Sequence, residues 1–145
     1  MSQFAQRFSG TERLYGITET ELLRQSHVCV VGIGGVGSWV AEALARSAIG
    51  KLTLIDLDDI CVTNTNRQIH ALQTTVGEAK VDAMRQRILD INPECEVHSV
   101  EDFVTPDNVA QMLNSTMAYV VDATDSVKAK ASMIAFCKRN KIPII

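Results

Sequence analysis

The chain has 145 residues, of which 46% are hydrophobic and 21% are charged, and this is the composition of a globular domain with a buried core. Its net charge of -3 lacks the basic excess of a dedicated nucleic-acid binder, and no apolar run reaches the roughly 20 residues of a transmembrane helix. The polar start has no apolar h-region of the kind that a signal peptide carries, and the four cysteines are far apart with no CxxC pair. We therefore expect a reduced, cytoplasmic protein without a disulfide scaffold or a zinc site.

The pattern along the chain predicts helices and strands in alternation. Helices are expected within 1–26, with a capped start near residue 18, and at 38–48, 77–91, 105–114 and 126–140. Buried strands are expected at 27–31, 51–55, 95–100, 117–121 and from about residue 141. This alternation indicates an α/β fold with a doubly wound, mainly parallel sheet and a Rossmann-like nucleotide-binding half.

Two further features concern the organisation of the chain. We expect residues 1–26 to form an N-terminal helical segment and 27–145 to form the Rossmann-like domain. Residues 60–76 have no clear periodicity, which in a compact domain is typical of a functional loop. The last residues have the pattern of a core strand, and a domain seldom ends inside one, so we expect the sequence to be the N-terminal part of a longer protein.

The glycine cluster after the first strand predicts a phosphate-binding turn. Gly32, Gly34 and Gly37 allow a tight bend and a close backbone approach, and the following helix directs its first amides at an anion. Asp56, at the end of the second strand, is placed to bind ribose hydroxyls. The alternative is that these glycines only pack the helix against the strand. The motif favours an adenine nucleotide but does not decide between a redox dinucleotide and ATP.

The residues after the second strand favour a triphosphate. Asn64, Arg67 and Lys80 would supply fixed donors and cations to one nucleotide. Taken singly, Lys80 has the pattern of a solvated residue on an amphipathic helix, and Arg67 that of an ordinary loop arginine.

Asp125, after the fourth strand, adds an acidic group. A carboxylate that faces a polyphosphate is best explained by a bridging Mg²⁺, although Asp125 could instead cap the next helix. Because the carboxyl ends of parallel strands meet at one edge of a sheet, we expect Asp125 to lie near the glycine turn and near Asp56 and Asp58. Together these residues favour an ATP site, with a nicotinamide dehydrogenase or a nucleotide sensor as alternatives from other classes.

The histidines and the single tryptophan belong to no motif. We expect His27, His70 and His98 to be structural or surface residues, and Trp39 to serve packing.

With these motifs in hand, the chain resembles the adenylyltransferase family that includes ubiquitin-activating enzymes and the bacterial ThiF, MoeB and HesA proteins. The resemblance covers nearly the whole chain and rests on GIGGVG, LIDLDDI, TNTNRQ, Lys80 and DATDS, in order and at similar spacing. The segments RFSGTERLYG, DDICVTNTNRQIHA and EDFVTPDNVAQ are most similar to the tRNA-modifying dehydratases of this family. Such enzymes attach AMP to a carboxylate and release pyrophosphate.

The resemblance implies ATP and Mg²⁺ as cofactors and a role for each matching residue. The implied nucleotide-binding residues are Gly32, Gly34, Gly35, Gly37, Asp56, Asp58, Asn64, Arg67 and Lys80. Arg67 and Lys80 would also be catalytic, and Asp125 would be both catalytic and the metal ligand. Arg13, with Arg7 as the alternative, would reach into a partner subunit's site, which implies a homodimer with shared active sites and contacts through residues 1–26.

The implied substrate is the threonyl carboxylate of threonylcarbamoyladenosine in tRNA, which would be adenylated and then cyclised with loss of water. The alternative is the C-terminus of a ubiquitin-like or sulfur-carrier protein, and the shared motifs do not separate the two. The resemblance also leaves open a cysteine-desulfurase sulfur relay as a partner.

Overall fold

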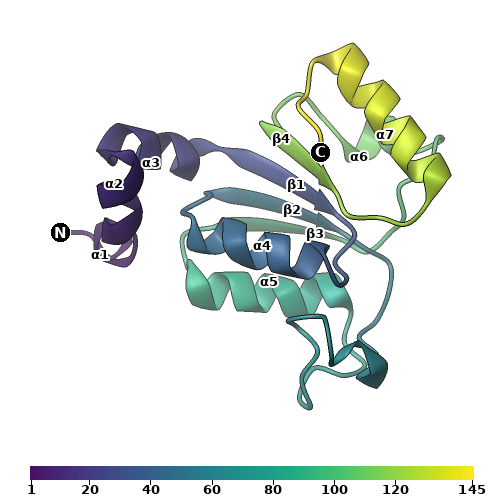
Figure 1. Ribbon diagram of the computed structural model, residues 1–145, viewed down its shortest axis with the longest axis horizontal. Helices are drawn as coiled ribbons and strands as arrows, with labels where there is room; N and C mark the ends of the chain where they lie inside the picture. Colours follow the sequence, from purple (N-terminus) through teal and green to yellow (C-terminus); the bar gives the residue numbers. More distant parts are fainter.

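Four parallel strands form one sheet, in the order β3-β2-β1-β4, in a computed structural model that describes residues 1–145 (Figure 1). The strands are β1 (His27–Val31), β2 (Lys51–Ile55), β3 (Glu96–Val100) and β4 (Tyr119–Asp122). The helices are α1 (Gln3–Arg7), α2 (Ser9–Tyr15), α3 (Ile17–Gln25), α4 (Gly37–Arg46), α5 (Lys80–Ile91), α6 (Val109–Met112) and α7 (Val127–Asn140), with a 3-10 turn η1 (Val62–Asn64). The expected α/β class and parallel sheet are confirmed.

The strand order reverses at β1, because β1 pairs with β2 on one side and with β4 on the other. Val31 lies opposite Ile55 of β2 and Asp122 of β4, so these three strands end at the same edge. In an open α/β sheet, the crevice beside such a reversal is where ligands bind. The topology therefore places the segments that follow β1, β2 and β4 next to one another.

Apolar cores cover both faces of the sheet, as a doubly wound fold requires. α4 and α5 pack over one face around Leu52, Leu54 and Met84, and α6 and α7 pack over the other around Leu113 and Met133 (Figure 1). Each fully buried side chain of this size contributes about 1.5–3 kcal/mol relative to an exposed one. The sheet is thus held from both sides, and its carboxyl edge is fixed in place. None of the helices combines the length and the apolar character needed to cross a membrane.

The N-terminal segment forms three short helices at the amino ends of the strands, away from the edge where the strands end (Figure 1). Phe4 and Phe8 pack with Ala48 in a small separate cluster. Arg24 lies 4.3 Å over the Phe4 ring and makes a 2.6 Å ion pair with Glu94. These contacts attach the segment to the sheet domain.

Two predicted helices begin later than the sequence suggested. The helix expected from residue 105 is only α6, because the Asn108 side chain accepts a hydrogen bond from the Thr105 amide at 2.8 Å and closes a turn around Pro106. The helix expected from Gly77 begins at Lys80, since Gly77 adopts a left-handed conformation with φ of 91°.

The strand expected from about residue 141 is present only as an isolated bridge beside β4. The Val120 amide donates to the Pro143 carbonyl at 2.9 Å, and Ile144 forms a parallel bridge with Val120. The chain therefore continues the sheet outward from β4, in the direction that a Rossmann order requires.

Candidate functional site

A cleft of about 910 Å³ lies beyond the carboxyl edge of the sheet. The segments that follow all four strands contribute to its walls. It is lined by nine of the residues expected at the site, namely Gly32, Gly34, Gly35, Asp56, Asp58, Asn64, Arg67, Lys80 and Asp125. The fold therefore brings together residues that are nearly one hundred positions apart in the sequence.

The glycines of the turn have two different jobs. Gly32 has φ of 88°, and a Cβ there would lie 2.6 Å from the Ala123 carbonyl oxygen. A Cβ on Gly37 would lie 1.6 Å from the Gly32 carbonyl oxygen, so the packing interpretation describes this residue, which does not line the cleft. Gly34 and Gly35 instead face the cleft, where the lack of a side chain leaves the backbone approachable.

Side chains from three elements hold the glycine turn. The Ile33 amide donates to the Asp56 carboxylate at 2.7 Å, and the Ile33 carbonyl accepts from Nε2 of His70 at 2.8 Å. Ser38 Oγ donates to the Gly34 carbonyl at 2.5 Å. The other Asp56 oxygen accepts from the Asp58 amide at 2.8 Å. Asp56 thus anchors the turn and keeps lone pairs for a ribose hydroxyl at the cleft.

His27 and His70 are structural, as expected. Both are buried, and burial is the main reason that the pKa of each lies below its ordinary value. His27 bonds Thr53 at 2.7 Å inside the sheet, whereas His70 bonds the glycine turn from behind.

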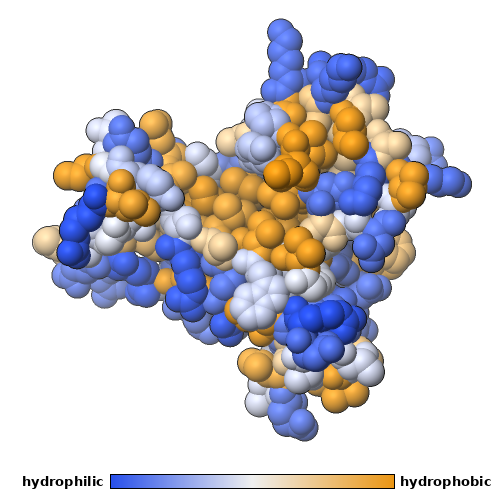
Figure 2. Space-filling model, viewed as in Figure 1, coloured by the Kyte–Doolittle hydropathy of each residue, from blue (hydrophilic) through white to orange (hydrophobic).

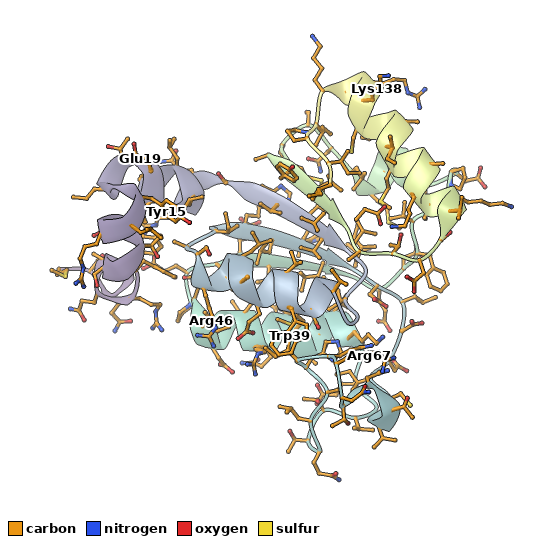
Figure 3. All side chains as sticks on the ribbon, viewed as in Figure 1. Tyr15, Glu19, Trp39, Arg46, Arg67 and Lys138 are labelled. Carbon is orange, nitrogen blue, oxygen red and sulfur yellow. The ribbon has the colours of Figure 1, made fainter.

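The loop after β2 lies against the glycine turn. Nε1 of Trp39, on α4, donates to the Arg67 carbonyl at 2.8 Å, so Trp39 is a hydrogen-bonding anchor (Figure 3). Its side chain is 51% exposed and joins no buried core cluster, so the expected packing role is not its main one. The Arg67 side chain packs its stem beside Gly35, and its Nη1 donates to the Thr63 carbonyl at 3.1 Å. Asn64 uses Oδ1 to accept from the Cys61 amide at 2.9 Å, which leaves its amide nitrogen for a ligand.

Lys80 is not the solvated residue that its helical position alone suggested. Its side chain is 8% exposed and lies at the start of α5, at the wall of the cleft. The ammonium makes no hydrogen bond within the chain, and its nearest carboxylate oxygen, on Asp58, is 4.0 Å away. A nearly buried cation with so weak a partner is suited to an incoming anion.

Asp125 is not the cap of α7, because Ser126 has that role and accepts from the Ala129 amide at 3.2 Å. The capping alternative is therefore wrong. Asp125 is exposed at the cleft and makes no hydrogen bond or ion pair. Asp122 is the buried acid of this segment, and it accepts from Lys130 at 3.2 Å and from the Thr124 amide at 3.0 Å.

The carboxylates at the cleft suit a metal ion that is held mainly by the phosphates of a bound nucleotide. No group of three or more histidine, cysteine, aspartate or glutamate side chains converges anywhere in the chain. Mg²⁺ in nucleotide sites is held by one or two carboxylates together with substrate phosphates. The unengaged carboxylate of Asp125 fits that requirement.

The structure adds cleft residues to which sequence reasoning gave no role. Gln68 is buried at the wall of the cleft, and its Oε1 has no hydrogen-bond partner. Its position directly after Arg67 in TNTNRQ was the available signal. The residues from Asp102 to Thr105 also line the cleft, and the rule on strand ends would have found them, because they follow β3.

Neither N-terminal arginine reaches the cleft of its own chain. Arg13 lies on α2 and bonds only the Ser9 carbonyl and hydroxyl, at 3.3 and 3.4 Å. Arg7 donates to the Ile91 carbonyl at the end of α5 at 3.1 Å. Arg13 is therefore the freer of the two candidates.

Comparison with known proteins agrees with this geometry. The model of the ThiF family matches residues 9–145. The tRNA threonylcarbamoyladenosine dehydratase of Escherichia coli is 64% identical over 140 residues, covering 97% of this chain and 52% of that protein. The enzyme of the same name from Haemophilus influenzae is 57% identical over 145 residues, covering 100% and 56%. The chain thus spans about half the length of the curated relatives it matches.

A solved structure shows the same fold. The crystal structure of Escherichia coli tRNA N6-threonylcarbamoyladenosine dehydratase in complex with ATP superimposes with a TM-score of 0.97 at 62% identity, covering 99% of this chain and 59% of that one. The sequence match and the superposition each extend over almost the entire chain, and together they show that it belongs to the ThiF family.

Proposed function

We propose that the chain is the nucleotide-binding part of a cytoplasmic, ATP-dependent enzyme that dehydrates threonylcarbamoyladenosine in tRNA. The observation that carries the proposal is the 64% identity with a dehydratase of that substrate along almost the whole chain. The cleft has the groups that would bind ATP, because it combines a glycine turn, a nearly buried ammonium and an unengaged carboxylate.

The proposed reaction has two steps, adenylation and ring closure. An oxygen of the threonyl carboxylate attacks the α-phosphorus of ATP, the bond to the β-phosphate bridging oxygen breaks, and pyrophosphate leaves. A nitrogen or oxygen of the same substituent then attacks the acyl carbon, AMP leaves, and a ring closes. The nucleotide therefore carries away the oxygen that the carboxylate loses, and the protein needs no nucleophile of its own.

Each wall of the cleft has a task in this scheme. The amides of the glycine turn and the start of α4 would receive phosphate oxygens, and Asp56 with Asp58 would hold the ribose. Asn64, Arg67 and Lys80 would bind the phosphates and stabilise the charge that develops as pyrophosphate leaves.

Asp125 would hold Mg²⁺ together with the phosphates. When bound, the ion neutralises phosphate charge and polarises the reacting phosphoryl group.

We also propose a homodimer in which Arg13 completes the partner's cleft, with contacts made through residues 1–26. Arg13 is exposed on α2, away from its own cleft, and has no bond outside its helix. Arg13→Ala and Lys80→Ala should each be nearly inactive alone, whereas mixing the two should restore part of the activity through mixed dimers. Full activity of Arg13→Ala, or no recovery on mixing, would reject the shared site.

The principal test uses the purified full-length protein with ATP, Mg²⁺ and threonylcarbamoylated tRNA. We expect pyrophosphate release and a loss of one water mass from the modified nucleoside, neither of which should occur with tRNA that lacks the modification. Pyrophosphate release that needs a ubiquitin-like carrier protein instead of tRNA would replace the proposal with its alternative. Adding a cysteine desulfurase and its acceptor and measuring binding would test the sulfur-relay partner in the same preparation.

A further inference from the structure

The charges of the chain are unevenly distributed. Residues 126–145 contain five of the 14 basic side chains and none of the 17 acidic ones. These residues comprise the end of the cleft, helix α7 and the first contacts of the next strand. A chain with a net charge of -3 therefore carries a distinctly basic element beside its cleft.

Four of the five basic side chains in residues 126–145 have no partner within the chain. The exposed ones, which form no ion pair and no hydrogen bond, are Lys128, Lys138, Arg139 and Lys141, and we call them the α7 basic row. Lys130 is the exception, because it pairs with Asp122 at 3.2 Å. Lys138 is labelled in Figure 3. Outside residues 126–145, every lysine and arginine side chain except that of Arg85 has at least one hydrogen bond or ion pair.

The row leads away from the cleft. Ser126 and Ala129, at the start of α7, line the cleft, and Lys128 lies between them in sequence. Arg139 is eleven residues later, about three helical turns and about 16 Å along the axis, and so returns to the same face as Lys128. Figure 2 shows hydrophilic side chains projecting from both ends of the α7 region.

We propose that the α7 basic row is a docking surface for the phosphate backbone of tRNA, which guides the modified nucleoside into the cleft. This inference rests on the proposed function, because that function makes a polynucleotide the substrate. Unpaired cations on a helix that begins at the cleft match a polyanion that must be held while one of its nucleosides reacts. An acidic membrane surface would also attract the row, but it has no part that must enter the cleft.

The chain offers a matched control for the test. Arg139 and Arg85 are both exposed arginines on helices, and neither has a partner. Full-length wild-type protein, Arg139→Glu and Arg85→Glu would be titrated with threonylcarbamoylated tRNA over a range of salt concentrations. We expect Arg139→Glu to weaken tRNA binding about tenfold and to lower the salt slope by about one, with Arg85→Glu within about twofold of wild type.

Other readouts separate the possible failures. ATP binding, measured by calorimetry, should be equal in all three proteins. If Arg139→Glu folds poorly, Arg139→Gln replaces it and should show a smaller loss of tRNA affinity. Wild-type affinity of both Arg139 variants for tRNA, in a protein that does modify tRNA, would overturn the docking surface alone. A wild-type protein that does not act on tRNA would overturn the proposed function. Loss of binding to vesicles containing phosphatidylglycerol, with unchanged tRNA binding, would assign the row to membranes.

Discussion

The two sides of the cleft differ in how firmly their functional groups are held. The glycine turn is fixed by the Asp56 carboxylate, by His70 and by Ser38, and its packing leaves no room for a Cβ on Gly37. Across the cleft, Asp125 is exposed and has no bond to any other group. We therefore expect the glycine-turn side to be organised before any ligand binds, whereas Asp125 would gain partners only from a ligand.

This contrast has a physical reason. Backbone amides that are already oriented stabilise phosphate charge without reorganising during the reaction. A lone carboxylate, by contrast, gains its partner only with a metal-bound phosphate, so a rigid position before binding would add nothing. Substitutions that deform the glycine turn should therefore lower stability, whereas substitution of Asp125 should lower activity alone.

The largest effect is expected for Gly37→Ala. Its Cβ would lie 1.6 Å from the Gly32 carbonyl oxygen and 3.3 Å from the Ala123 Cβ, so the turn must deform. We expect a loss of about 3 kcal/mol or more in the free energy of unfolding, measured by urea denaturation. Gly35→Ala is the matched control, because its nearest neighbour is the flexible stem of Arg67 at 3.5 Å, and it should lose less than about 1 kcal/mol. Equal losses in the two variants would contradict a packing role specific to Gly37.

Asp125→Asn should separate activity from stability. Without the carboxylate, the turnover rate with Mg²⁺-ATP should fall at least about 100-fold, which corresponds to a loss of several kcal/mol of transition-state stabilisation. The melting temperature should stay at the wild-type value, because the side chain has no partner to lose. Ser126→Ala provides the converse, since loss of the α7 cap should cost about 1 kcal/mol of stability. A fall in melting temperature for Asp125→Asn, in step with activity, would contradict the free carboxylate.

His70 should make the stability of the glycine-turn side depend on pH. Burial lowers its pKa from 6.5, so the unfolded chain binds the proton at a higher pH than the folded protein does. Stability is therefore fully present above about pH 6.5 and falls as the pH is lowered below that value. His27 acts in the same direction, so His70→Gln should flatten the dependence in part. Melting temperatures between about pH 5 and pH 8 check this, and an equally steep dependence in His70→Gln would contradict it.

The sequence predicted the sheet and nine of the residues that line the cleft, because strand patterns and short motifs identify both. The bounds of β1 and β2 were predicted correctly from their apolar runs, and the rule on strand ends brought Asp125 to the glycine turn. The three-helix form of residues 1–26 was missed, since short polar helices have weak periodicity and are held here by the Phe4 and Phe8 contacts.

What the sequence could not supply was the partner of each side chain. The burial of Lys80 depends on how α5 begins after Gly77, and the free state of Asp125 depends on Ser126 taking the cap. The role of Trp39 likewise depends on a loop that lies 28 positions further along the chain. The Trp39 contact joins residues far apart in the sequence, and the other two depend on the backbone conformation near Gly77 and Ser126, which residue spacing alone does not determine.

The smallest effect is expected for Trp39→Phe, which tests how the loop after β2 is held to the glycine turn. Phenylalanine keeps the ring but loses the 2.8 Å hydrogen bond to the Arg67 carbonyl. One such bond contributes about 1 kcal/mol, so the KM for ATP should rise about fivefold while kcat changes little. The effect on the free energy of unfolding should be smaller than that of Gly37→Ala, because the ring is half exposed and its packing is retained. A lower kcat with an unchanged KM would instead place Trp39 in the reacting geometry, and the loop would then position Arg67 for catalysis rather than for binding.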